Sequence, residues 1–115
     1  MQPIINWIFY KNTSSASTAD DMKPFINVTA DTMAVEVRGT GTFTLKMQGR
    51  TDINNGGAWE DIAVIKLSDL TKKETITAPG IYELGIEGLQ EVRANITSLS
   101  GGALSVLGRA VNTGM

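Results

Sequence analysis

The sequence predicts an all-β protein, namely a single antiparallel β-sandwich of jelly-roll or immunoglobulin-like type, with about eight short strands and at most one helical turn. Apolar and polar residues alternate over several short segments, which is the period-2 pattern of half-buried strands. The 115-residue chain contains 12 glycines, more than average usage gives, and these favour turns between short strands. No amphipathic segment is longer than a helical turn.

The size of the chain fits one domain. A globular chain of 115 residues, of which 42% are hydrophobic, buries roughly two thirds of its unfolded surface and supports a single core. Within it, we expect residues 1–30 to form an N-terminal strand and a Ser/Thr-rich arm that together serve as the contact region. Residues 31–115 then form the sandwich.

Residues 4–10 form the first predicted strand, and both of its faces are apolar. The faces would carry Ile5, Trp7 and Phe9 on one side and Ile4, Ile8 and Tyr10 on the other. The chain has no predicted helices to cover a second apolar face, so two interpretations remain open. Either this strand lies in the middle of the sandwich, under a loop at 12–29, or these six residues form an interface with a neighbouring copy.

The central part of the chain predicts four more strands. Residues 33–38 and 42–48 alternate regularly, and Gly39-Thr40-Gly41 between them predicts a tight hairpin. Residues 59–66 and 74–77 form the next two strands. The spacer 67–71 could hold a single helical turn with Ser68 as its cap.

The C-terminal part predicts three strands, at 82–87, 91–97 and 103–111. Residues 88–90 link the first two, and Gly101-Gly102 is the turn of a last hairpin. Residues 12–21 are rich in Ser, Thr and Ala without periodicity, so we expect a loop there.

The absence of two residue types excludes much enzyme chemistry. The chain has no cysteine and no histidine, which removes Cys/His zinc sites, thiol nucleophiles and imidazole bases. Adjacent carboxylates at 20–21 and 60–61 point to opposite sides of an extended chain, so they do not form an acid/base pair. We therefore expect a non-enzymatic protein without a cofactor.

Charge and hydropathy limit the partners. A net charge of −2 without a basic stripe does not indicate nucleic-acid binding. No apolar run approaches the roughly 20 residues needed to cross a bilayer, and no export signal is apparent at the N-terminus. We expect no nucleic-acid partner, no membrane partner and synthesis in the cytoplasm.

The segment 52–57 resembles the start of a calcium loop, but Ala63 stands where such a loop needs a bidentate glutamate. Asn-Asn-Gly-Gly within it favours a turn. A calcium ion held by Asp52, Asn54 and Asp61 remains the alternative.

Two aromatic residues are candidates for stacking on a sugar ring. Trp59 opens a predicted strand, and Tyr82 lies on the apolar face of another. Both fit more simply into the core, because a chain with few aromatic residues would lose much burial by exposing them.

The order of turn and core motifs over residues 32–111 resembles a known group of proteins. The motifs are Gly49-Arg50, Trp59, Gly80-Ile81-Tyr82, Val92-Arg93 and Gly101-Gly102. This order resembles the small all-β virion proteins from the structural modules of tailed phages and prophages, which include head-decoration, head-fibre and tail or baseplate modules.

The resemblance implies a structural component of the virion, and first of all a capsid decoration or head-fibre protein. Its partners would be other copies of itself and the major capsid or tail protein, in a homo-oligomer. The alternative is a tail or baseplate module that binds host carbohydrate, with Trp59 and Tyr82 as its ligand residues.

Overall fold

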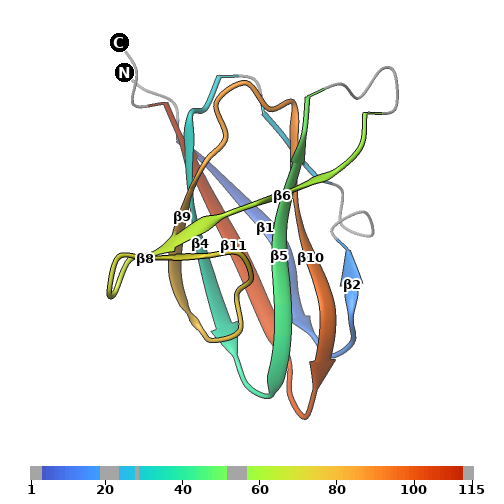
Figure 1. Ribbon diagram of the computed structural model, residues 1–115. Helices are drawn as coiled ribbons and strands as arrows, with labels where there is room; N and C mark the ends of the chain where they lie inside the picture. Colours follow the sequence, from blue (N-terminus) through green and yellow to red (C-terminus); the bar gives the residue numbers. More distant parts are fainter. Residues whose placement is uncertain (1–3, 19–23, 28, 52–56, 113–115) are drawn as a thin grey trace.

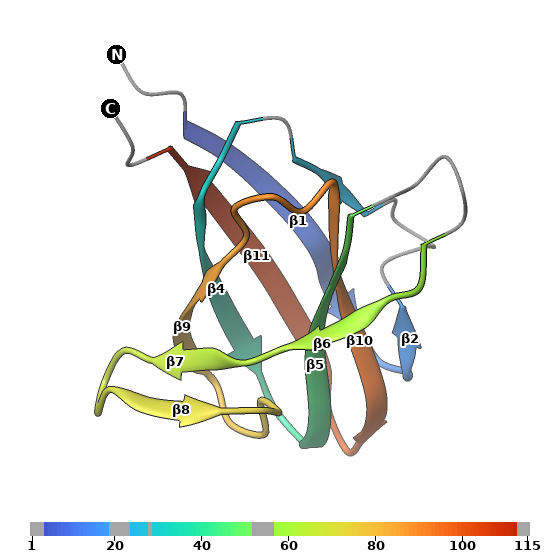
Figure 2. The same ribbon diagram turned by 45° about the horizontal axis from the view of Figure 1, so that its top comes forward.

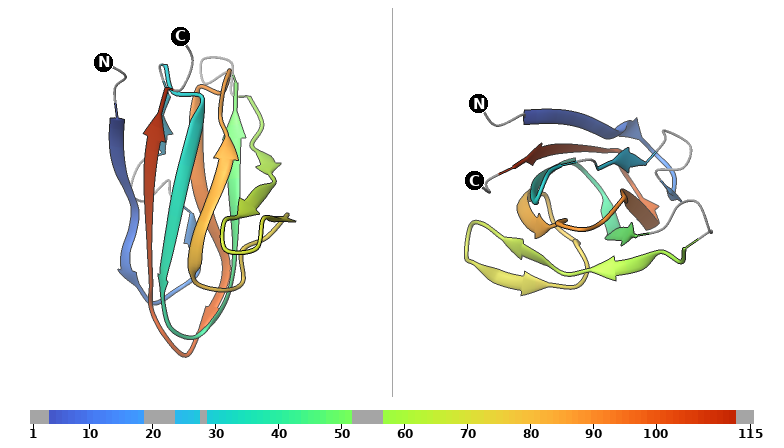
Figure 3. Two further views of the ribbon diagram at one scale, coloured as in Figure 1. Left: turned by 90° about the vertical axis from the view of Figure 1, so that its left-hand side faces the viewer. Right: turned by 90° about the horizontal axis from the view of Figure 1, so that it is seen from above.

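A computed structural model describes residues 4–18, 24–27, 29–51 and 57–112 of the chain. These residues form strands, turns and irregular segments without a helix, and the strands build two antiparallel sheets that face each other (Figure 1). Figure 3 shows the two layers from the side and from above. The predicted all-β sandwich is confirmed.

The larger sheet, called sheet A, has six strands in the order β1-β11-β4-β9-β7-β8. Their bounds are Ile4–Thr13 for β1, Leu104–Val111 for β11, Thr32–Gly39 for β4, Gly80–Gly85 for β9, Val64–Lys66 for β7 and Thr71–Lys73 for β8. Sheet B has the order β2-β10-β5-β6, and β3 also pairs with β10. Its bounds are Ser17–Thr18 for β2, Glu91–Ser100 for β10, Thr42–Arg50 for β5, Glu60–Ile62 for β6 and Phe25–Ile26 for β3.

The core lies between the sheets and follows the alternation predicted from the sequence. The inward side chains of β4 and β5 are all buried: Met33, Val35, Val37, Phe43, Leu45 and Met47. Ile86, Val92, Ala94 and Ile96 from the C-terminal half join them. Their neighbours in the chain are at least partly exposed, as the pleat of a strand requires, except for the buried Glu91.

The three glycine turns predicted as hairpins or links instead carry the chain from one sheet to the other. Residues 39–41 join β4 of sheet A to β5 of sheet B, and 101–103 join β10 to β11. Residues 86–90 likewise connect β9 to β10. The hairpin predictions at 39–41 and 101–102 were wrong, because alternation shows which residues face the core and not which strand is the hydrogen-bonded neighbour.

The two crossings at 39–41 and 101–103 pack against each other at one end of the sandwich. Thr40 N–H donates to Ala103 O at 3.1 Å. A Cβ on Gly102 would lie 2.2 Å from Thr40 O, and a Cβ on Gly39 would lie 2.0 Å from Ala103 O. The glycines therefore allow two backbones to approach more closely than side chains would permit.

The strand predicted at 59–66 is divided between the two sheets. Its first part is β6 in sheet B, its second part is β7 in sheet A, and Ala63 lies between them. In the segment predicted as the strand 74–77, Ile76 forms an isolated bridge with Leu45 of sheet B. The chain thus leaves sheet B at Ala63, forms a hairpin in sheet A, and returns at Ile76.

The spacer 67–71 forms the turn of the β7–β8 hairpin, and this turn is closed by a hydrogen bond of the type found in a single helical turn that does not continue. Leu70 N–H donates to Lys66 O at 2.7 Å, and Leu70 has a φ of 59°. The side chain that accepts hydrogen bonds here is Asp69 rather than Ser68. Its carboxylate binds the N–H of Thr71 at 3.1 Å and the hydroxyl of Thr71 at 2.6 Å.

The Ser/Thr-rich segment 12–21 is partly strand. β1 continues to Thr13, and Ser17 and Thr18 pair with Ile96 and Asn95 of β10. Residues 19–21 lie outside the described residues. The loop prediction was therefore wrong at both ends of the described part, because short polar strands at a sheet edge carry no alternation signal.

Candidate functional site

β1 places its apolar residues in two different environments. Phe9 and Tyr10 are buried, and Trp7 is half-buried with its ring edge against Phe25, the ring centroids being 5.8 Å apart. The register with β11 shifts between Ile8 and Tyr10, so a β-bulge turns two consecutive side chains inward. The Tyr10 hydroxyl donates to Ala94 O of sheet B at 2.8 Å.

The isoleucines of the same strand remain accessible. Ile4 and Ile8 lie on the outer face of sheet A and are 52% and 51% exposed, and Ile5 is 39% exposed. β1 is also the edge strand of sheet A and not a central strand. The interpretation that places this strand in the middle of the sandwich was therefore wrong, although Phe9 and Tyr10 enter the core and are not available for an interface. An interface with a neighbouring copy stays a prediction for the accessible residues of the strand.

Ile8 belongs to a row of side chains that crosses the outer face of sheet A. The register places Ile8 opposite Leu107, Leu107 opposite Glu36, and Glu36 opposite Ile81. Ile81 is 47% exposed. Because directly opposed residues on one face have Cβ atoms about 5 Å apart, these four side chains adjoin one another. They are called the sheet A row below.

The surface is hollowed along the sheet A row. A hollow of about 590 Å³ is lined by Asn6, Trp7, Ile8, Ala34, Glu36, Ile81, Leu107, Gly108 and Arg109. A second, smaller hollow shares Ile8 and Leu107 and extends toward Lys11 and Arg38. The larger hollow is called the sheet A groove below. Its floor is apolar, and its charged groups are Glu36 and Arg109.

Glu36 is ion-paired within its own strand. Arg38 Nη2 lies 2.7 Å from Glu36 Oε1, and the hydrogen bond from this guanidinium lowers the pKa of Glu36 below its usual range. The two side chains are 37% and 67% exposed, so the pair adds little to stability. It does keep a charged carboxylate in the middle of the sheet A row.

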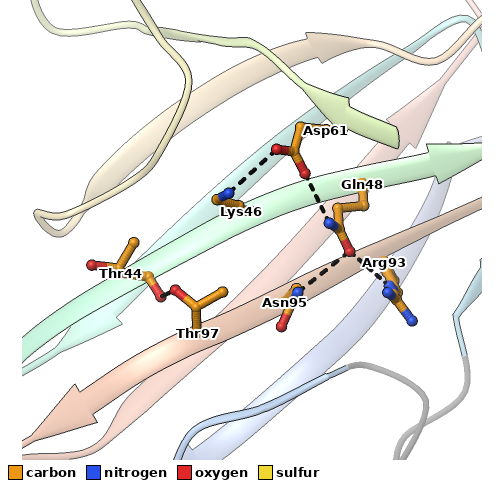
Figure 4. Close-up of polar contacts among 7 residues, drawn as sticks. All are labelled: Thr44, Lys46, Gln48, Asp61, Arg93, Asn95 and Thr97. Atoms are coloured by element: carbon orange, nitrogen blue, oxygen red, sulfur yellow. Dashed lines mark hydrogen bonds and ion pairs between the residues drawn. The ribbon is translucent and has the colours of Figure 1, made fainter. Parts of the chain in front are cut away.

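The outer face of sheet B is polar and its groups bond to one another (Figure 4). Gln48 donates to Asp61 Oδ1 at 2.8 Å and accepts from Arg93 Nε at 2.9 Å. Lys46 Nζ lies 3.3 Å from Asp61 Oδ2. The pKa of Asp61 is lowered, chiefly by the hydrogen bond from Gln48. This face thus differs in chemistry from the apolar row of sheet A.

Trp59 lies on this polar side and not in the core, so its predicted core position was wrong. The guanidinium carbons of Arg50 and Arg93 lie 4.4 Å and 4.3 Å from its ring centroid. Arg50 is held in turn by Glu91, whose Oε1 accepts from Arg50 Nε at 2.7 Å. Cation–π contacts therefore replace core burial for this indole.

Tyr82 is buried as predicted, with 2% of its surface exposed and its hydroxyl donating to Ala78 O at 2.6 Å. It lies in β9 of sheet A, whereas Trp59 lies beside sheet B. The structure does not bring these two candidate sugar-stacking residues together.

The candidate calcium ligands are only partly described. Asp52 and Asn54 lie outside the described residues, and Asp61 is engaged by Gln48 and Lys46. Across the ranges that the structure describes, no three acidic side chains gather in a way that could hold a metal ion. The same ranges contain no helix that is long and apolar enough to cross a membrane.

The raised pKa of Tyr82 predicts that the folded state becomes less stable at alkaline pH. Burial, and to a smaller extent the charge of Asp69, raise the pKa of Tyr82 above 10.0. The unfolded chain releases this proton near pH 10 while the folded chain keeps it, so the free energy of unfolding should fall as pH rises above about 10. Urea titrations between pH 8 and 11 should show this fall in the wild type and a shallower one in Tyr82→Phe. An equal slope in both proteins would contradict the assignment.

The two antiparallel sheets define a small β-sandwich protein, and two comparisons with known proteins place this fold. The family model described as XepA matches residues 4–110, so the chain belongs to the XepA family. The structure also resembles that of the SPBc2 prophage-derived protein YomS, with a TM-score of 0.84 and 18% identity over 97% of this chain and 96% of that one.

A second solved structure is that of the PBSX exported protein XepA, with a TM-score of 0.87 and 27% identity over 96% of this chain. The chain spans 38% of the length of that protein. No curated protein matches the chain. The chain is therefore a β-sandwich protein of the XepA family that shares its fold with a prophage-derived protein, which agrees with the coarser part of the resemblance seen in the sequence.

The outward-facing residues of β9 and β11 were not identified as site residues from the sequence. Ile81 and Leu107 complete the sheet A row with Ile8, but each stands alone among polar neighbours on its face of the strand. The sequence does contain one signal for these residues. β11 has apolar residues at both odd and even positions, as residues 4–10 do, so both faces of the strand carry apolar side chains.

Proposed function

We propose that this protein is a non-enzymatic structural component of a phage particle and acts by packing against copies of itself and against a larger particle protein. The observation that supports this best is the sheet A row, which holds accessible isoleucines on a folded sheet. Burying one such side chain is worth about 1.5–3 kcal/mol. Membership in the XepA family and a fold shared with the prophage-derived protein YomS support a phage role.

The edge of sheet A that β1 forms also supports an interface between copies at this edge. β1 has 10 residues, and no charged residue occurs between positions 4 and 10. The opposite edge, β8, has three residues, of which two are lysines. Charges, short length and bulges protect a sheet edge from pairing, so residues 4–8 of β1, which precede its bulge, lack the protection that β8 has. A contact surface, and not an active site, is what a repeated building block needs.

Replacing Ile8 tests the assembly. The wild type should have a mass several times 12.3 kDa by light scattering, and Ile8→Asn should raise the dissociation constant about 10- to 100-fold. Ile8 is half-exposed, so the stability of the fold should change by less than about 0.5 kcal/mol. Ile26→Asn is the matched control, since Ile26 is 59% exposed beside sheet B.

The same measurement can reject the proposal. A wild type that stays monomeric at high concentration would show that the sheet A row is not an interface between copies. Equal weakening by Ile26→Asn and Ile8→Asn would show that the row has no special role.

Within the particle we propose the capsid surface, as a decoration or head-fibre protein. Such a position requires repeated contacts with a lattice and no catalytic group. The related PBSX protein is described as exported, so the test must follow both particles and medium. Electron microscopy of purified particles with labelled protein should show label on heads. Label on tails would move the role to the tail or baseplate, and protein found free in the medium and absent from particles would overturn the structural role.

The alternative of a carbohydrate-binding tail module receives less support from the geometry. Tyr82 is buried, and the ring of Trp59 is already in contact with two guanidinium groups. A glycan array probed with the wild type and Trp59→Ala addresses it directly. Binding that the substitution abolishes in a folded protein would favour the alternative.

A further inference from the structure

We infer that two copies of this protein join edge to edge through residues 4–8 of β1, which pair antiparallel around a two-fold axis at Asn6. This inference rests on the assembly proposed above and names the strand and the register by which copies meet. Such pairing joins the two copies of sheet A into one continuous sheet. Figure 2 shows β1 beside β11, at the end of sheet A opposite β8.

Residues 4–8 have backbone groups that can accept a further strand. In the described part of the chain, β1 pairs with β11 alone, so its N–H and C=O groups that point away from β11 have no ladder partner. Every residue from 4 to 8 is exposed except Trp7, which is half-buried. The register shift that follows Ile8 ends the regular ladder. The segment before it has the length of an ordinary short strand.

The side chains of this segment are complementary to those of a second copy. With the axis at Asn6, Ile4 of one copy lies opposite Ile8 of the other on the outer face of the sheet. Ile5 lies opposite Trp7 on the inner face. The carboxamide of Asn6 lies opposite its own copy, and two carboxamides can bond to each other because each has a donor and an acceptor. Apolar residues thus oppose apolar residues, and the amide opposes an amide.

The neighbouring registers do not have this property. An axis at Ile5 would set Ile4 opposite Asn6, and an axis at Trp7 would set Asn6 opposite Ile8. Both leave the amide against an isoleucine. An axis between two residues would bring the outer face of one copy against the inner face of the other. The order of residues along the edge therefore favours a second copy of the same strand, held in one register.

Charge permits the same contact. No charged residue occurs between positions 4 and 10, so two copies of this edge approach each other without opposing like charges. Arg109 is in register with Asn6 on β11. Across the axis, the two copies of Arg109 would be separated by three strand spacings, or roughly 14 Å at about 4.8 Å each. That separation exceeds the screening length of about 8 Å at physiological ionic strength.

The pairing also buries apolar surface next to the sheet A row. Ile4 and Ile8 are 52% and 51% exposed, and the two-fold axis makes the contact between them twice. Ile8 belongs to the sheet A row and lines one end of the sheet A groove. Ile4 of the second copy therefore extends the row and adjoins that end of the groove. Backbone hydrogen bonds and apolar burial thus act together at this edge.

Cysteine trapping tests the register, since the chain has no native cysteine. Asn6→Cys should form a disulfide-linked dimer, because residue 6 faces its own copy and a disulfide needs Cα atoms within about 7 Å. Ile4→Cys mixed with Ile8→Cys should also link. Neither of these two variants should link alone, because the two copies of residue 4 would lie roughly 14 Å apart along the strands. The matched control is Lys72→Cys, exposed on the opposite edge strand, which should stay unlinked.

A charge swap at the axis tests the same contact without a covalent bond. Asn6→Lys sets two lysines opposite each other, and Asn6→Asp sets two aspartates opposite each other. Each variant alone should raise the dissociation constant about tenfold or more. A mixture of the two places lysine opposite aspartate and should restore association. Ile26→Lys adds the same charge at an exposed position beside sheet B and should leave the dissociation constant unchanged.

The outcomes distinguish this inference from the proposed function. Urea unfolding first establishes that each variant is as stable as the wild type, which the exposure of Asn6 leads us to expect. An assembled wild type in which Asn6→Cys stays unlinked would overturn the edge pairing and leave the assembly standing. Self-linking of Ile4→Cys alone, or a charge-swap mixture that stays dissociated, would likewise overturn it. A monomeric wild type would overturn both the pairing and the packing between copies.

Discussion

Replacing Gly102 by alanine should lower the free energy of unfolding by about 3 kcal/mol. The new Cβ would lie 2.2 Å from Thr40 O, 2.3 Å from Thr40 C and 2.5 Å from the Thr40 hydroxyl. Two of these atoms are backbone, so the chain at 39–41 would have to move. That movement would also strain the hydrogen bond from Thr40 N–H to Ala103 O. Urea unfolding followed by tryptophan fluorescence measures the change.

Gly85→Ala is the matched control for Gly102→Ala. Gly85 lies in β9, and a Cβ there would meet nothing within 4 Å. The substitution also reduces the freedom of the unfolded chain, so it should be neutral or slightly stabilising. If Gly102→Ala lost less than about 1 kcal/mol relative to Gly85→Ala, the close packing of the two crossings would be wrong.

The crossings at 39–41 and 101–103 also show which part of the fold could not be predicted from the sequence, namely the pairing of the strands. Alternation over 33–38 and 42–48 correctly identified the core-facing residues of β4 and β5. The same inward pattern arises whether two successive strands pair in one sheet or face each other across the core. The pairing of β4 with β11 and β9 links distant parts of the chain, and no local pattern encodes it.

The candidate site was predicted in part, for a similar reason. Residues 4–10 were identified by their two apolar faces, but the bulge that turns both Phe9 and Tyr10 inward has no sequence signal. Leu107 and Ile81 join Ile8 only because β11 and β9 bring them into register with β1 and β4. The single helical turn predicted over 67–71 has its counterpart in the hydrogen bond from Leu70 N–H to Lys66 O, but the φ of 59° at Leu70 could not be predicted because leucine rarely adopts it.

Phe9 should contribute more to stability than any exposed residue of β1. Its ring is fully buried, so Phe9→Ala should lower the free energy of unfolding by about 3–5 kcal/mol through lost burial and a cavity. Its neighbour Ile8 points to solvent, and Ile8→Ala should change the same quantity by less than about 0.5 kcal/mol. Urea unfolding of both variants gives the comparison, and similar losses would contradict the placement of the bulge.

The contact between Phe9 and Gly108 explains why a glycine lies in the middle of β11. A Cβ on Gly108 would lie 2.8 Å from Phe9 Cε2 and 3.2 Å from Met33 Sδ. Gly108→Ala should therefore cost about 1–3 kcal/mol by overpacking. Leucine at position 9 has no atom equivalent to that ring carbon, so the double variant with Phe9→Leu should lose at least about 1 kcal/mol less than the sum of the single losses.

A parallel cycle on the other face of β1 provides the control. Ile8 pairs with Leu107 and faces solvent, so Ile8→Ala and Gly108→Ala should be additive within about 0.5 kcal/mol. Coupling to Phe9 without coupling to Ile8 would show that Gly108 is required by the packing of the ring and not by the strand itself. Additivity in both cycles would mean that the cost of alanine at position 108 arises in the backbone of β11 or at Met33.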